Sequence, residues 1–201
     1  MKALARKTMV SLFTGITACA GQAATYVWDG GSAADNNWSS AENWSADAAP
    51  VSASDTVVQL TGTIRATNIT QDIASPFVLN RLEFLNVGST AFAVGGSPFQ
   101  VAANGDVQPY FYLTRAATCT MSNPVEIPAG TTLNMHFTTY GLTLYGVVSG
   151  PGGIDKQDQD GGLTLDNGAN SFSGGLTVRG KDKDWCKVNI QNSGAMGTGP
   201  V

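Results

Sequence analysis

The sequence predicts an all-β protein folded as a parallel β-helix, and three observations lead to this prediction. Short apolar runs alternate with polar residues at a period of two, which is the period of a half-buried strand. Glycine, present 24 times, and asparagine close most of these runs, as expected where a backbone turns through positive φ. Apolar pairs also recur after 21 to 23 residues, a length that suits one coil of a solenoid.

A β-sandwich is the alternative fold class. Its strands are commonly joined by tight hairpins, and Asn104-Gly105 and Asn167-Gly168 are dipeptides typical of such turns. The C-terminal half favours the solenoid, because its apolar runs are shorter and its glycine corners more frequent than a sandwich requires.

Residues 1–24 have the layout of a secretory signal peptide. Lys2, Arg6 and Lys7 precede a mostly apolar run from Thr8 to Ala20, and small residues follow the run. The run is shorter than the about 20 residues that a membrane-spanning helix needs, so we expect cleavage at the end of this segment rather than a retained anchor. The mature chain is therefore expected at the cell surface, in the outer membrane or outside the cell.

A lipoprotein signal is the alternative interpretation of the same segment. Ile16-Thr17-Ala18-Cys19 resembles a lipobox, in which the cysteine is lipidated and becomes the first residue of the mature chain. Under this alternative, Cys19 anchors the protein to a membrane.

Residues 25–60 are predicted to form the start and cap of the solenoid. This segment contains Trp28, Trp38 and Trp44, and the end of a solenoid needs bulky side chains to shield its core and its edge. Flat indole rings also stack on sugar faces, so these tryptophans are the candidate glycan-binding residues. The two interpretations predict different orientations of the indole rings, because capping rings face the core, whereas sugar-binding rings must face the solvent.

Residues 61–201 are predicted to form the coils. In each alternating run, the apolar residues are expected to face inward: Leu82 and Phe84, Leu133, Met135 and Phe137, Leu142 and Leu144, Leu163 and Leu165, Leu176 and Val178, Val188 and Ile190. His136, the only histidine, then faces outward. The clearest repeat is at 161–180, where two Gly-Gly pairs each precede a Leu-Thr strand and where Asn170 and Phe172 are expected to fix the intervening turn.

This repeat resembles a known family. The run Leu163–Val178 has the order leucine-x-leucine, asparagine, aromatic, serine, glycine and threonine-containing strand, and it is similar to the autotransporter-associated β-strand repeat. The run Ser149–Ile154, followed by Lys156, resembles the strand that leads into this repeat. The motifs around Trp28 and Trp44 are similar to the N-terminal start of large secreted proteins built from such repeats.

The resemblance implies a right-handed parallel β-helix that is exported, usually in Gram-negative bacteria, and that serves as a stalk or adhesive surface. The implied partners are an extracellular glycan or a host or matrix surface, together with outer-membrane export machinery or the barrel of a parent protein. Only one clear repeat is present and a further strand would be expected after Val201, so we expect an N-terminal fragment of a longer protein.

A carbohydrate-binding or carbohydrate-cleaving extracellular β protein is the alternative function. Cleavage requires paired carboxylates on one face of the fold, and Asp158 and Asp160 would project to the same side of an extended strand. The same two carboxylates are the candidate calcium ligands, because hard cations prefer clustered oxygen atoms. Their surroundings are polar on every side, which is typical of an exposed loop. We therefore predict no catalytic residue, no enzymatic activity and no cofactor.

The net charge argues against one class of partner. The formal net charge is −4, and it becomes −7 once the three basic residues of the signal peptide are removed. A negatively charged surface repels nucleic acid, so no nucleic-acid partner is expected.

Cys119 and Cys186 meet an oxidising environment after export, where they either pair or remain small buried thiols.

Overall fold

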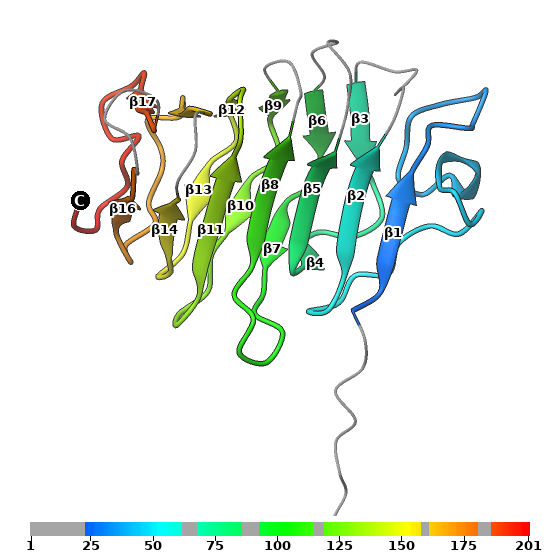
Figure 1. Cartoon of the computed structure of the whole chain (residues 1–201), viewed down its shortest axis with the longest axis horizontal. Helices are drawn as coiled ribbons and strands as arrows, with labels where there is room; N and C mark the ends of the chain where they lie inside the picture. Colours follow the sequence, from blue (N-terminus) through cyan, green and yellow to red (C-terminus); the bar gives the residue numbers. More distant parts are fainter. Residues whose placement is uncertain (1–22, 62–67, 86–92, 115–118, 158–160, 181–185) are drawn as a thin grey trace, which may run out of the picture.

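The computed structural model describes residues 23–61, 68–85, 93–114, 119–157, 161–180 and 186–201. These residues form an all-β solenoid of about 5 turns, in which the coils stack along the long axis of the molecule (Figure 1). The predicted parallel β-helix is confirmed. The β-sandwich alternative is wrong, because strands of one sheet pair in parallel with strands one coil away. Within the described ranges, no helix is long and apolar enough to span a membrane.

Three parallel sheets make up the walls of the solenoid. Sheet A has seven strands, in the order β1 (Thr25–Trp28), β2 (Val57–Thr61), β5 (Arg81–Leu85), β8 (Tyr110–Thr114), β11 (Thr132–Phe137), β14 (Gly153–Lys156) and β16 (Leu176–Val178). Sheet B has six, in the order β3 (Asn68–Gln71), β6 (Ala93–Gly96), β9 (Cys119–Met121), β12 (Leu142–Leu144), β15 (Leu163–Leu165) and β17 (Val188–Ile190). Sheet C has four: β4 (Phe77–Leu79), β7 (Phe99–Val101), β10 (Val125–Glu126) and β13 (Val148–Ser149).

Inward side chains of one coil lie directly on those of the next coil. The register of sheet A aligns one buried row consisting of Trp28, Leu60, Phe84, Leu113 and Phe137. Neighbouring strands lie about 4.8 Å apart, so the side chains of this row are in contact from β1 to β11. The inward direction predicted from the period of two is confirmed for all the named residues from Leu82 to Leu176, which are buried.

The last coil departs from the predicted pattern. Val178 and Ile190 pair in register with inward positions, yet they are 43% and 40% exposed. The prediction that they are buried is wrong because β16 and β17 are the outermost strands of their sheets, and a described coil covers them on one side only. The recurrence from Leu142 to Leu163 is a true coil of 21 residues, whereas Val188 pairs with Leu163 rather than Leu165, which makes that coil 25 residues long.

Asn170 and Phe172 fix the turn after β15, as predicted. The side chain of Asn170 accepts a hydrogen bond from the backbone N–H of Val148 (2.8 Å) and donates one to the carbonyl of Ala195 (2.8 Å). One buried amide therefore joins three successive coils, and the ring of Phe172 is fully buried beside it. Sheet C has no described strand at this level of the solenoid, and the asparagine adds side-chain links to the backbone hydrogen bonds that Ser171 and Ser173 make with the coil before them.

Some corners bring two coils closer than a side chain would allow. Gly150 has φ +99°, and a Cβ atom added there would lie 2.4 Å from the carbonyl oxygen of Ile127 in the coil before it. Gly130 has a similar backbone, with φ +71°, but nothing lies within 4 Å of its added Cβ. A substitution at Gly130 therefore tests the free-energy cost of the backbone conformation alone, whereas one at Gly150 also tests the cost of a clash with the neighbouring coil.

We expect Gly150→Ala to destabilise the fold more than Gly130→Ala. Both variants place an L-residue in the left-handed region, at a cost of about 1–2 kcal/mol. Only Gly150→Ala adds a clash with a neighbouring coil, so its midpoint of urea unfolding should be clearly lower than that of Gly130→Ala. Equal midpoints for the two variants would contradict the close approach of the coils at this corner.

Candidate functional site

The outer face of sheet A carries two rows of polar and aromatic side chains that run across the coils. Outward and inward residues alternate along each strand, so every coil adds one or two members at fixed positions. One row consists of Arg81, Tyr110, Asn134, Asp155 and Thr177, and the other consists of Gln59, Glu83, Tyr112 and His136. We call these two rows the sheet A outer face.

Three aromatic rings form the centre of this face. Tyr110 and Tyr112 stack with ring centroids 5.6 Å apart and an interplanar angle of 20°. His136 from the next coil lies 5.3 Å from the Tyr112 ring and 6.2 Å from the Tyr110 ring. The predicted outward direction of His136 is thereby confirmed. The three rings are partly exposed, so they form an aromatic ridge on an otherwise polar surface.

The environment of Tyr110 favours its neutral form. Burial raises the pKa of Tyr110 to about 12, and the neighbouring Tyr112 and Glu83 act in the same direction, whereas Arg81 opposes them. The phenol therefore keeps its proton, and with it the ability to donate a hydrogen bond, throughout the physiological pH range.

Polar contacts join neighbouring coils on the N-terminal side of the aromatic ridge. The amide of Gln59 donates a 2.8 Å hydrogen bond to the carboxylate of Glu83 in the next coil. Arg81 lies 3.8 Å from the other oxygen of the same carboxylate, with 42% of its side chain exposed. An exposed ion pair of this kind contributes little to stability. Its effect is to hold three polar groups of two coils in fixed positions.

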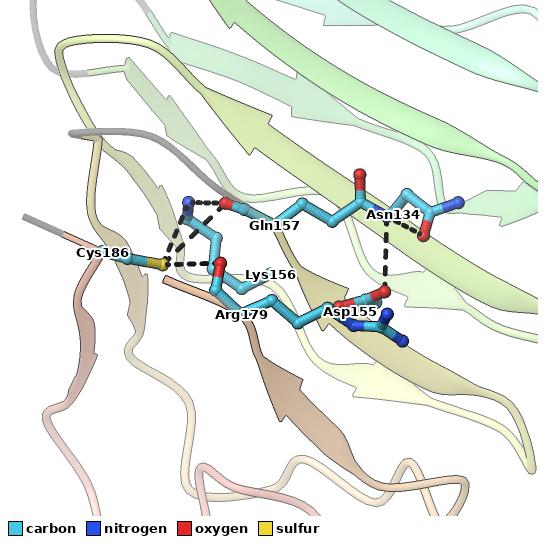
Figure 2. A network of polar contacts seen from close by, with 6 residues as sticks. All are labelled: Asn134, Asp155, Lys156, Gln157, Arg179 and Cys186. Carbon is cyan, nitrogen blue, oxygen red and sulfur yellow. Dashed lines mark hydrogen bonds and ion pairs between the residues drawn. The ribbon is translucent and has the colours of Figure 1, made fainter. Parts of the chain in front are cut away.

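A second polar group lies on the C-terminal side of the ridge (Figure 2). The carboxylate of Asp155 has only 7% of its side chain exposed, and the Nε atom of Arg179 lies 3.1 Å from its Oδ1 atom. The amide of Gln157 donates to Asn134 (2.9 Å) and to the second oxygen of Asp155 (3.3 Å). Side chains from three consecutive coils are therefore connected around one nearly buried negative charge.

Behind this group, a lysine occupies a position in the apolar interior. Lys156 pairs in register with Met135 and is fully buried. Its Nζ atom donates a 2.8 Å hydrogen bond to the backbone carbonyl of Gln157 and lies 5.1 Å from the centroid of the Phe137 ring. The Sγ atom of Cys186 is 3.9 Å from the same nitrogen (Figure 2).

Sequence reasoning missed this lysine and its neighbour. Strict alternation along β14 places Lys156 on the same side as Ile154, so the inward direction was detectable from the period of two. The approach of Cys186 was not detectable, because it depends on the path of the chain between β16 and β17.

The three tryptophans proposed as glycan-binding residues lie in the core. Trp28, Trp38 and Trp44 are at most 1% exposed and pack edge to face, with centroid distances of 5.1 Å between Trp28 and Trp44 and 5.5 Å between Trp38 and Trp44. Trp38 also packs against Phe77 and Phe99 of the following coils. The glycan assignment is therefore corrected, because a buried ring offers no face on which a sugar can stack.

The remaining predicted site residues lie outside the described residues: Cys19, Asp158 and Asp160. Within the described ranges, no group of three or more histidine, cysteine, aspartate or glutamate side chains is placed to hold a metal ion.

The structure answers the open question about the two thiols. Cys119 is buried, Cys186 is partly exposed, and no disulfide joins the two thiols. Cys119 begins β9, and Cys186 lies two residues before β17, which is three strands away from β9 in sheet B. A strand spacing of about 4.8 Å puts roughly 14 Å between these strands. A disulfide requires Cα atoms about 4.4–6.8 Å apart, so the two thiols cannot pair within this fold.

Comparison of the chain with protein-family models, with curated proteins and with solved structures gives no match. The solenoid of about 5 turns is compatible with the β-helical fold that the sequence resemblance implies.

We expect Tyr110 to ionise at a higher pH than a free tyrosine side chain. Its pKa of about 12 in the folded protein is above the value of 10.0 for a free side chain. Its contribution to stability is therefore complete below pH 10 and is lost as the pH rises from 10 to 12. In an alkaline titration followed by tyrosinate absorbance, Tyr110→Phe should remove a step near pH 12. The control Tyr145→Phe, which removes a tyrosine that is 49% exposed, should retain that step. A step near pH 12 that survives in Tyr110→Phe would contradict the assignment.

Proposed function

We propose that this chain is a non-enzymatic, exported structural or adhesive scaffold, and that the sheet A outer face is its contact surface. The observation that carries this proposal is the alignment of outward side chains, coil after coil, in the two rows from Gln59 to Thr177. A surface of this kind presents equivalent groups at regular intervals of about 4.8 Å. Such spacing suits an extended polymer or a matrix, which offers repeated contacts rather than one small molecule.

The rigidity of the face supports this role. From β2 to β14 its side chains stand on strands whose opposite sides are buried, and hydrogen bonds and ion pairs connect the neighbouring coils. Because little conformational freedom remains to be lost on binding, even modest contacts from each coil add to a useful affinity. A scaffold needs no reaction centre to act in this way.

The composition of residues 1–24 supports export. In this proposal the segment is removed as a signal peptide, and outer-membrane export machinery or the barrel of a parent protein carries the solenoid to the cell surface. Lipidation at Cys19 is the alternative route to a surface location. Both routes expose the sheet A outer face to the surroundings of the cell.

Carbohydrate binding is the second candidate function, and the aromatic ridge is the observation that favours it. Tyr110, Tyr112 and His136 offer partly exposed rings, and Asn134 and Glu83 offer hydrogen-bonding groups beside them. Apolar ring surface next to planar polar side chains matches the two kinds of surface that a sugar presents. The binding residues would then be these three aromatic residues rather than the buried tryptophans.

The export proposal predicts the fate of the N-terminal segment. Expressed in a Gram-negative host, the full chain should be recovered outside the inner membrane with residues 1–24 removed, because the segment has the layout of a signal peptide. A variant that lacks residues 2–24 should remain in the cytoplasm. Fractionation and N-terminal sequencing measure both outcomes. A mature chain beginning with lipidated Cys19 would favour the lipoprotein route, and a full-length chain in the cytoplasm would refute export.

The surface proposal predicts which side chains matter for binding. The mature chain, tested on an array of immobilised glycans and purified matrix proteins, should bind at least one class. The double variant Tyr112→Ala, His136→Ala should lose at least tenfold in apparent affinity, because it removes the exposed rings of the ridge. The control Tyr145→Ala removes an exposed ring from the corner between sheets B and C, and it should bind as the wild type does. If the double variant binds as tightly as the wild type and circular dichroism shows an intact fold, the aromatic ridge is not the contact surface.

A further inference from the structure

Among the described residues, a buried amine and a partly exposed thiol from different coils lie side by side. The Nζ atom of Lys156, in the coil of β14, lies 3.9 Å from the Sγ atom of Cys186, in the coil of β16 and β17. Thirty residues separate the two in the chain. No function described above requires this contact.

The lysine is held in place by its surroundings. It is fully buried, it donates to the carbonyl of Gln157, and its Nζ atom lies over the ring of Phe137. The position is an inward one, aligned with Met135 on one side and with Val178 on the other. An amine at such a position cannot exchange its contacts for water without local opening of the coil.

The thiol is held beside the amine but remains within reach of the solvent. Sγ of Cys186 lies 3.9 Å from the carbonyl oxygen of Gln157 and 3.8 Å from that of Arg179, and the residue is partly exposed. Figure 2 shows contacts from the sulfur to the amine and to these two backbone carbonyls. A small oxidant such as a peroxide can therefore reach the sulfur.

We propose that Cys186 and Lys156 form an oxidative cross-link through a direct sulfur–nitrogen bond. In the first step, the sulfur attacks a peroxide oxygen, so that Cys186 becomes a sulfenic acid, the peroxide O–O bond breaks and one water is released. In the second step, the neutral amine of Lys156 attacks the same sulfur, the S–O bond breaks, and the hydroxyl group leaves as water with one amine proton. The thiol and amine together lose two hydrogen atoms, and one peroxide is reduced to two water molecules.

The pairing of these residues follows from their positions. A sulfenic acid is usually captured by a second thiol, but Cys119 lies three strands away in sheet B and is out of reach. The amine of Lys156 is already within 3.9 Å, and rotations of its four-carbon stem can close the remaining gap. The link would fasten the outermost described coil to the coil beneath it, where the fold has neighbours on one side only.

The test is intact-mass analysis of the mature chain after treatment with one equivalent of hydrogen peroxide and removal of the excess. We expect a mass loss of two hydrogen atoms, a peptide pair that joins Lys156 to Cys186 after proteolysis, and full reversal by dithiothreitol. Cys119→Ser should still form the link, whereas Cys186→Ser and Lys156→Met should not. Methionine is a suitable replacement for the lysine, because Met135 occupies the aligned inward position one coil away.

Each other result overturns the proposal. Oxidation of Cys186 to a sulfinic acid, or dimerisation through Cys186, with Lys156 unmodified would show that the amine does not capture the sulfur. A link between the same residues that contains one additional oxygen atom would replace the direct bond with an oxygen-bridged one. Because the mass measurement on the wild-type chain does not depend on any variant, a variant that fails to fold leaves the conclusion intact. The result is also independent of adhesion and of export.

Discussion

The hydrogen bonds between parallel, in-register coils are the constraint on which the rest of this structure depends. Each coil places its backbone groups opposite those of its neighbour, so every side chain is aligned with the corresponding side chain of the coils before and after it. An apolar residue at an inward position must be followed by others, as in the row from Trp28 to Phe137. The same alignment creates the outward rows of sheet A. The same strand register therefore aligns both the side chains of the core and those of the proposed contact surface.

Two of the buried polar side chains, those of Asn170 and Lys156, bond to backbone groups of the coils. Asn170 links the backbone of the coil before it to that of the coil after it, at a level where sheet C has no described strand. Lys156 occupies the inward position that is aligned with Met135 and Val178, and its amine donates to the backbone carbonyl of Gln157 just after β14. In both cases a buried polar side chain is retained because an unpaired backbone group would cost more.

The sequence was sufficient to predict the fold class, the inward residues of most coils and the turn at Asn170, because each depends on local alternation and on corner residues. It was not sufficient for contacts that depend on the length of a coil. Glu83 pairs with Tyr112, 29 residues further on, whereas Tyr112 pairs with His136 after 24 residues, so the aromatic ridge could not be assembled from a fixed period. The exposure of Val178 and the approach of Cys186 to Lys156 likewise depend on which coil lies outermost and on the path of its connections.

The connection between β7 and β8 includes one tight turn. Asn104 and Val107 bond to each other in antiparallel fashion, Gly105 sits at the tip with φ +58°, and the loop projects beyond the stack where the chain enters β8 (Figure 1). The coils on either side keep their register around it. A solenoid therefore separates the requirements for stacking from the length of its loops: the strands must repeat, but a corner can lengthen without displacing them. This corner is where a foreign epitope or a small domain could be displayed with the least disturbance to the stack.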